Sequence, residues 1–285
     1  MVEYTGNMVT ILSCSDCNVK CKHCYISYSG KFEGENLANL VTKLRKKYTV
    51  RINGAEPLIH EDYLKAFSLS GQYGPLTNGL VFKNNYEYLD KIKEAGMREL
   101  YISYHFDFHD QVSLVDKKYL QELFKEIKKR GLNFVIMCTI TSKNYMNIPQ
   151  YCKQAVEFGA SAIKFTNFLK QGKAKNMDSD LILSESQLKE FFRLLHIERQ
   201  KYDKNEFEVK RCGSFGKDLY KSSNFKCVSG TDNLCISPSG DVYPCVFLAK
   251  PGYEIGKVID DKIYISKDWL NDGSKCLAKE ECNTL

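Results

Sequence analysis

The chain has 285 residues, a net charge of +6 at pH 7, 43% hydrophobic and 27% charged residues. This length can bury a full core, and the absence of a run of about 18 apolar residues argues against a membrane span. The first ten residues lack a basic segment followed by a long apolar run, so no signal peptide is expected. The basic runs at 43–47 and 125–130 fit solvated helix faces better than a nucleic-acid groove.

Twelve residues are cysteines, too many for chance and too few for a small disulfide-stapled domain. In a reducing compartment such cysteines are metal ligands more often than disulfide partners. The composition therefore predicts a cytoplasmic protein in which several thiols bind metal.

Strand and helix patterns alternate along the chain up to about residue 205. The expected strands are 8–13, 50–53, 76–78, 99–105, 134–140 and 162–168, and the expected helices are 35–48, 61–69, 85–95, 117–129, 148–158 and 185–202. Six such units predict an α/β fold, a partial (β/α)6 barrel of parallel strands over 1–205. A small cysteine-rich domain with a β-hairpin and helix is expected over 206–285. In such folds the functional side chains gather where strands end.

Cys17, Cys21 and Cys24 follow the first expected strand with CxxxCxxC spacing. Three thiolates so placed can bind three irons of a 4Fe–4S cluster and leave the fourth iron without a protein ligand. The alternative is a zinc site, which needs a fourth ligand. His23 lies between two of the cysteines, and Cys14 is the other nearby candidate.

This cysteine motif resembles that of the radical S-adenosylmethionine (SAM) superfamily. The resemblance implies a SAM-binding 4Fe–4S cluster whose open iron chelates the amino and carboxylate groups of SAM. It also implies reductive cleavage to a 5′-deoxyadenosyl radical, which abstracts hydrogen from a substrate. The electron would come from a donor such as flavodoxin or ferredoxin.

The loop after the second expected strand, N-G-A-E-P at 53–57, resembles the superfamily's G-G-E-P loop, which holds the SAM amino group. Gly54 and Glu56 are the implied contacts, because an ammonium group needs carbonyls, a carboxylate and a backbone that can approach closely. The sequence departs from the motif, since Asn53 replaces the first glycine and Ala55 separates Gly54 from Glu56.

Three further segments resemble the same superfamily. Asn78 lies in a T-N-G sequence near the implied adenosine site, and Ser103 lies where relatives place a ribose contact, although an ordinary strand serine is the alternative. Tyr25, directly after the third cysteine, is a further implied SAM contact. The segment 168–174, F-L-K-Q-G-K-A, is similar to the L-x-P-x-G-R-A segment of members with additional clusters.

A second group of cysteines lies in the C-terminal part. Cys227 and Cys245 flank an expected hairpin whose turn is 238–241, and Cys276 and Cys282 follow. This pattern resembles the SPASM and Twitch domains and implies one auxiliary 4Fe–4S cluster held by these four cysteines. A zinc ribbon is the alternative, because four cysteines satisfy zinc equally well.

The other cysteines fit the role of buried small hydrophobic residues, as expected for Cys138 and Cys152. Cys212 and Cys235 are also candidate hydrogen donors to a substrate radical, or alternative cluster ligands. The segment 105–110 is expected to line the pocket, with His105 as a candidate acid or base.

The function expected from the resemblance is a radical SAM enzyme that modifies a ribosomally made peptide by crosslinking, thioether formation or epimerisation. The alternative is dehydrogenation or epimerisation of a small molecule such as an aminocyclitol or a sugar, and a more remote one is a non-catalytic zinc-binding module. The short stretch before Cys17 leaves no room for a leader-binding module, which favours a small substrate, or a peptide delivered by a separate leader-peptide-binding protein. No nucleic acid or membrane partner is expected.

Overall fold

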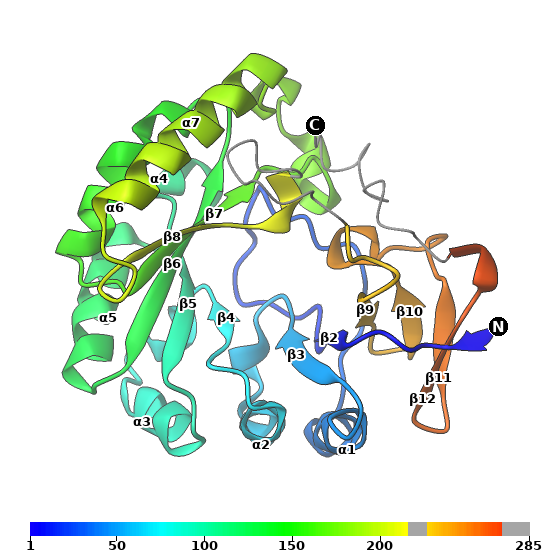
Figure 1. Cartoon of the computed structure of the whole chain (residues 1–285). Coiled ribbons are helices and arrows are strands. Elements are labelled where there is room, and N and C mark those ends of the chain that lie inside the picture. The colour runs from blue at the N-terminus through cyan, green and yellow to red at the C-terminus, as the bar shows by residue number, and fades with distance from the viewer. Residues whose placement is uncertain (216–226, 270–285) are drawn as a thin grey trace.

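The computed structural model describes residues 1–215 and 227–269, which form two sheets and a layer of helices (Figure 1). One sheet has five parallel strands in the order β4-β5-β6-β7-β8. Its strands are β4 Leu76–Thr77, β5 Glu99–Ser103, β6 Asn133–Ile140, β7 Ala162–Asn167 and β8 Glu208–Arg211.

The other sheet has seven strands in the order β1-β12-β11-β10-β9-β2-β3. They are β1 Val2–Glu3, β2 Met8–Leu12, β3 Thr49–Asn53, β9 Asn233–Ile236, β10 Asp241–Tyr243, β11 Gly256–Ile259 and β12 Lys262–Ile265. Strand β2 pairs in parallel with both β3 and β9, so the C-terminal strands extend the sheet that begins the barrel. No backbone pairing joins β3 to β4 among the described strands, which leaves the barrel wall interrupted there.

The helices cover the outer face of the parallel strands (Figure 1). They are α1 Gly34–Leu44, α2 Leu64–Ser70, α3 Glu87–Glu94, α4 His109–Val112, α5 Lys117–Lys129, α6 Ile148–Glu157 and α7 Glu185–Lys201. Helix α5 illustrates why they form: the Asp116 side chain accepts a hydrogen bond from the Tyr119 amide, and Leu120, Leu123 and Ile127 form its buried face. It ends before Gly131, which has a φ of +70°.

The predicted α/β fold with a partial barrel of parallel strands is confirmed, and α5 has the predicted bounds. Helix α1 ends at Leu44 rather than 48, because the chain must turn into β3 at Thr49. The prediction that the alternation stops near residue 205 is wrong. Strand β8 pairs in parallel with β7, so one more strand of the barrel sheet follows the expected boundary.

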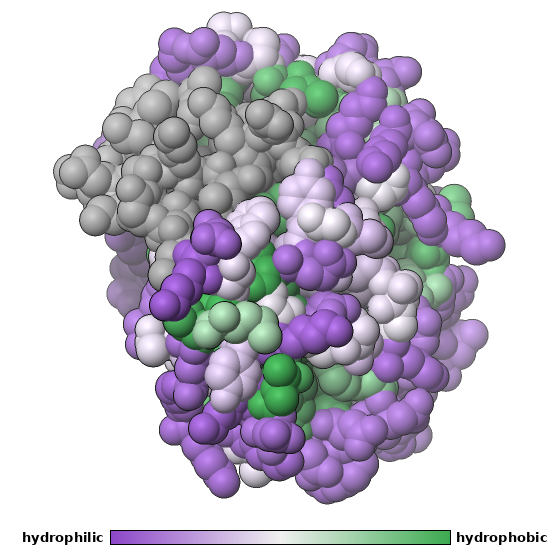
Figure 2. All heavy atoms as spheres, turned by 90° about the vertical axis from the view of Figure 1, so that its right-hand side faces the viewer, coloured by the Kyte–Doolittle hydropathy of each residue, from purple (hydrophilic) through white to green (hydrophobic). Residues whose placement is uncertain are grey.

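The core lies between the sheets and the helices and is rich in aromatic rings. Phe124 stacks on Phe134 at 4.5 Å, and Phe191 stacks on Phe215 at 4.2 Å, with all four rings buried. The face turned to the reader in Figure 2 is mostly hydrophilic with scattered hydrophobic side chains. Within the described part of the chain, none of the helices has the length and apolar character needed to cross a membrane.

Candidate functional site

The candidate site is built where the loops after β2 and β3 run side by side. The Ser13 amide donates to the Asn53 carbonyl at 2.6 Å, the Ala55 amide to Cys14 at 2.9 Å, and the Glu56 amide to Asp16 at 3.0 Å. Three consecutive backbone bonds thus continue the β2–β3 pairing beyond the ends of the strands. They place the 53–57 loop directly against the segment that leads to Cys17.

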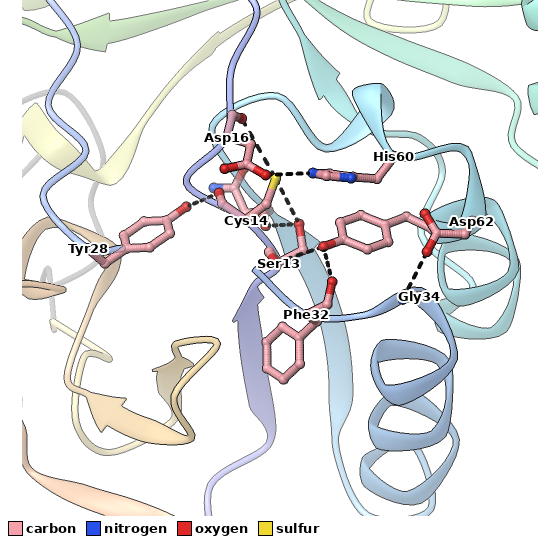
Figure 3. A network of polar contacts seen from close by, with 10 residues as sticks. Ser13, Cys14, Asp16, Tyr28, Phe32, Gly34, His60 and Asp62 are labelled. Atoms are coloured by element: carbon pink, nitrogen blue, oxygen red, sulfur yellow. Dashed lines mark hydrogen bonds and ion pairs between the residues drawn. The ribbon is translucent and has the colours of Figure 1, made fainter. Parts of the chain in front are cut away.

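A network of polar contacts fixes the base of this segment (Figure 3). The Tyr28 hydroxyl donates to the Cys14 carbonyl at 3.1 Å, and the Tyr63 hydroxyl donates to the Ser13 carbonyl at 3.2 Å. His60 Nε2 lies 3.2 Å from Asp16 Oδ2. Both tyrosines are buried, so these bonds are shielded from water and hold the chain rigidly before the first cysteine of the motif.

The two loops also approach closely at Gly54. A Cβ at this position would lie 2.8 Å from Ser13 Oγ and 3.1 Å from Cys14 Sγ. Any side chain would therefore push the two loops apart, so the close contact requires glycine at this position.

Glu56 is fully buried at the rim of the site. Its Oε2 accepts a hydrogen bond from the Asn78 amide at 2.6 Å. Its Oε1 is buried and has no hydrogen-bond partner within residues 1–215 and 227–269. Burial raises the pKa of Glu56 to about 7, against the lowering effect of the Asn78 bond. A buried carboxylate oxygen left unpaired is costly, and a cationic ligand would satisfy it.

Asn78 connects this carboxylate to the cysteine motif. Its amide reaches Glu56, and its side-chain Nδ2 lies 3.7 Å from Cys17 Sγ and 2.9 Å from Asn18 Oδ1. The loops after β2, β3 and β4 therefore meet at one place, as the sequence predicted for the carboxyl ends of parallel strands.

The three cysteines of the motif line one loop and differ in exposure: Cys17 is exposed, and Cys21 and Cys24 are half-buried. Burial, together with the neighbouring Cys17, raises the pKa of Cys21 to about 11. Across the described residues, no three His, Cys, Asp or Glu side chains converge closely enough to hold a single metal ion. Thiolates that each bind a different iron of a cubane cluster stand farther apart than the ligands of one zinc ion.

The loop after β7 supports the third cysteine. The Lys173 amide donates to the Cys24 carbonyl at 2.9 Å. Gly172 has a φ of +55°, and a Cβ there would lie 2.6 Å from the Cys24 carbonyl oxygen and 2.8 Å from that of Ile26. The G-K-A sequence singled out above thus packs on the cysteine loop, and only glycine allows that contact.

The other implied SAM contacts lie around the same rim. Tyr25 is half-buried and packs edge-to-face on Phe247 at 5.5 Å, which brings the C-terminal segment next to the cysteine loop. Ser103 is the last residue of β5 and is half-buried. Their roles as SAM contacts stay predictions.

His105 belongs to a group of three histidine rings that the sequence analysis did not anticipate. Its ring lies 4.6 Å from that of His23 and 5.4 Å from that of His109. Burial lowers the pKa of all three, that of His23 to about 4. His105 Nδ1 accepts a hydrogen bond from the Thr139 amide, so the proton of the neutral ring is on Nε2. This bond occupies the lone pair that a base would need, so His105 fits a structural hydrogen-bond acceptor better than a base.

Cys227 and Cys245, which flank the hairpin, are both buried. Burial raises the pKa of Cys245 to about 11, with a smaller contribution from Cys227 nearby. Cys235 is also buried, and Cys212 is half-buried. The burial of Cys235 gives no support to its predicted role as a hydrogen donor. Cys276 and Cys282 lie outside the described residues.

The histidine group and the Asp16–His60 contact are what the sequence analysis missed. His23 lies 82 positions before its partner His105, and His60 lies 44 positions after its partner Asp16, so no local pattern connects either pair. For the histidine group, the available sequence signal was the position of His23 inside the cysteine motif.

Comparison with known proteins shows which fold this is. No protein-family model matches the chain. The structure of Streptococcus suis SuiB bound to precursor peptide SuiA has a TM-score of 0.71 and 15% identity, covering 95% of this chain and 66% of that one. The structure of anSMEcpe with bound AdoMet and Cp18Cys peptide has a TM-score of 0.68 and 18% identity, covering 97% and 88%. At such identities the likeness establishes the fold.

Two curated proteins match parts of the sequence. Pre-heme d1 synthase of Dinoroseobacter shibae is 27% identical over 183 residues, 58% of this chain and 44% of that protein. The 7,8-dihydro-6-hydroxymethylpterin dimethyltransferase of Methanocaldococcus jannaschii is 28% identical over 146 residues, 42% of this chain and 27% of that protein. The matches thus span less than half the length of each of these relatives.

Proposed function

This chain has the fold of the radical SAM enzymes, and on that premise we propose that it is an enzyme of that kind. Cys17, Cys21 and Cys24 would hold a 4Fe–4S cluster that leaves one iron open for SAM. When bound, the cluster supplies the electron that splits SAM into methionine and a 5′-deoxyadenosyl radical. The observation that carries the proposal is the unpaired Oε1 of Glu56, buried beside the cysteine motif.

The residues of the rim fit the amino-acid end of SAM. Glu56 Oε1 would accept a hydrogen bond from the SAM ammonium group, and that charge would offset the cost of ionising a buried carboxyl. The Asn78 amide already holds the other oxygen, which fixes the carboxylate in place. Gly54 lets the 53–57 loop lie directly against Ser13 and Cys14, which keeps Glu56 next to the cysteine loop.

The donor set also fits iron and sulfur. Three thiols on one loop, with Cys17 exposed, suit a cluster that binds a small molecule at its fourth iron. Asn78 Nδ2, 3.7 Å from Cys17 Sγ, would donate a hydrogen bond to that sulfur and stabilise its thiolate.

A second cluster is part of the proposal. Cys227 lies close enough to Cys245 to raise the pKa of that thiol, and the two would supply two of the ligands of the second cluster. Cys276 and Cys282 are the proposed remaining ligands. The contact between Tyr25 and Phe247 supports placing this second centre near the first.

For the substrate we propose a ribosomally made peptide, modified by a crosslink, a thioether or an epimerisation. SuiB and anSMEcpe, which share the fold, are seen with bound peptides. The second candidate is a small molecule, dehydrogenated or epimerised, because both curated relatives are named for reactions on small molecules. In either case a donor such as flavodoxin or ferredoxin would supply the electron in the cytoplasm, and a separate leader-binding protein would deliver a peptide.

The first experiment measures iron and acid-labile sulfide per chain after anaerobic reconstitution, for the wild type and for Cys17/Cys21/Cys24→Ala. About eight irons falling to about four supports two cubane clusters. About four falling to none supports the SAM cluster and removes the auxiliary cluster. No iron in either protein, with zinc bound instead, would return the chain to a zinc-binding module.

The substrate is tested separately. If a short open reading frame lies beside the gene, its translated peptide is incubated with the reconstituted protein, SAM and reductant. A SAM-dependent change in peptide mass supports peptide modification. No change in the peptide, together with SAM-dependent oxidation or epimerisation of an aminocyclitol or sugar, favours the second candidate.

A further inference from the structure

The surface beside the cysteine loop is basic. Lys20 and Lys22 are exposed on the loop itself, between the first and third cysteines. Lys173 and Lys175 are exposed on the 3-10 segment Gly172–Asn176, whose Lys173 amide bonds to the Cys24 carbonyl. Two segments far apart in sequence thus place four exposed lysines on or beside one loop.

These lysines have no ion-pair partner within the described part of the chain. Other exposed lysines of this protein do pair: Lys65 with Glu35 at 2.9 Å, Lys91 with Glu61 at 2.6 Å and Lys189 with Glu185 at 2.6 Å. The charge beside the loop is therefore not neutralised by neighbouring carboxylates, and it is available to an acidic partner.

An exposed apolar side chain lies next to this charge. The Lys22 amide donates to the Val112 carbonyl at 3.0 Å, which holds the segment between α4 and α5 against the loop. Leu114, in that segment, is 72% exposed. Weak electron-transfer complexes bury little surface, and complementary charge steers their encounter.

We propose that Lys20, Lys22, Lys173 and Lys175, together with Leu114 beside the same loop, form the docking surface for an acidic, low-potential electron-transfer protein. The inference rests on the proposed function, because that function requires an electron to enter at the cysteine loop. Cys17 is the exposed cysteine of the motif, so a donor bound here would lie next to the centre that it reduces.

The test compares two double variants with the same change in charge. Lys22→Glu/Lys173→Glu alters the docking surface. Lys46→Glu/Lys125→Glu is the control. Lys46 lies between α1 and β3, at the end of the strands that is remote from the cysteine loop, and Lys125 lies on the outer helix α5. All four side chains are exposed, so both variants are expected to fold.

The probe is a flavodoxin, and its Kd for the reconstituted protein is measured by calorimetry at low and high salt. The docking variant is expected to bind at least about tenfold more weakly at low salt and to lose most of the salt dependence, with the control within about twofold of wild type. Reduction of the cluster by the flavodoxin, followed by electron paramagnetic resonance, should slow in parallel. Equal flavodoxin binding by the two variants would overturn the proposal.

Two further measurements separate the possible failures. Photoreduced deazaflavin, which needs no docking surface, should reduce the cluster equally in all three proteins. If deazaflavin cannot reduce the wild-type protein, the proposed function is contradicted, whereas the binding of flavodoxin still tests the docking surface. Loss of binding to an acidic peptide with unchanged flavodoxin binding would assign the lysines to the peptide and refute the electron-donor assignment.

Discussion

Replacing Glu56 by Gln should stabilise the protein without its cofactors and weaken SAM binding. Burial raises the pKa of Glu56 from 4.5 to about 7, so ionising this carboxyl costs the folded state more than the unfolded chain. The difference corresponds to about 3 kcal/mol. This cost is absent well below pH 4.5, where the carboxyl is protonated in both states. It grows as the pH rises from about 4.5 to about 7 and is complete above about 7.

Gln is uncharged at every pH and has nearly the shape of protonated Glu. The Glu56→Gln variant should therefore match wild type near pH 4.5 and exceed it by up to about 3 kcal/mol at pH 8. Urea unfolding of the protein free of iron and SAM, at both pH values, measures the difference. A stability difference that does not change with pH would refute the assignment of Glu56 as a buried carboxyl with a raised pKa.

SAM binding should respond in the opposite direction. The SAM ammonium group favours the ionised carboxylate, so the affinity of wild type should fall as the pH drops below about 7, by at most tenfold per pH unit. The Gln variant should bind SAM about 10- to 100-fold more weakly at pH 8, because it loses a charge-assisted bond of about 1.5–3 kcal/mol. Calorimetry on the reconstituted proteins measures both effects, and equal affinity of variant and wild type would remove Glu56 from the SAM site.

Three further variants test the surroundings of the site. Gly172→Ala should lower the free energy of unfolding by about 1–3 kcal/mol and reduce iron retention, because the added methyl group meets the Cys24 carbonyl and the φ of this residue is positive. Gly213→Ala is the control, since a Cβ there meets nothing within 4 Å. Asn78→Ala should weaken SAM binding by about 1 kcal/mol in calorimetry while leaving the unfolding midpoint nearly unchanged, and a normal affinity would separate Asn78 from the site. Phe191→Ala should cost about 3–5 kcal/mol in urea unfolding, because its buried ring stacks on Phe215, and a loss below about 1 kcal/mol would contradict that packing.

The sequence predicted the barrel well because its helices carry strong local signals. Helix α5 combines an Asp116 cap, a regular apolar face and Gly131 after its end, and its bounds agree with the prediction. Strand β8 was missed because its four residues, E-V-K-R, have one apolar side chain between charged ones. Such an edge strand is specified by pairing with β7 rather than by its own composition.

For the site, the motifs predicted which loops meet but not how they are held. The meeting of Glu56 and Asn78 follows from the rule that parallel strands end at one edge. The contacts of His60 with Asp16 and of His23 with His105 depend on tertiary packing between loops, which no periodicity records. The pairing of β9 with β2 likewise joins residues more than 200 positions apart, beyond the reach of any local pattern.

The most direct test of the proposed function is the formation of 5′-deoxyadenosine. Reconstituted wild type and the Cys17/Cys21/Cys24→Ala variant are incubated with SAM and photoreduced deazaflavin under anaerobic conditions, and the products are measured by mass spectrometry. Wild type is expected to produce 5′-deoxyadenosine and methionine, and the variant none. Equal product from both proteins, or none from a wild type that carries a reduced cluster, would contradict the assignment.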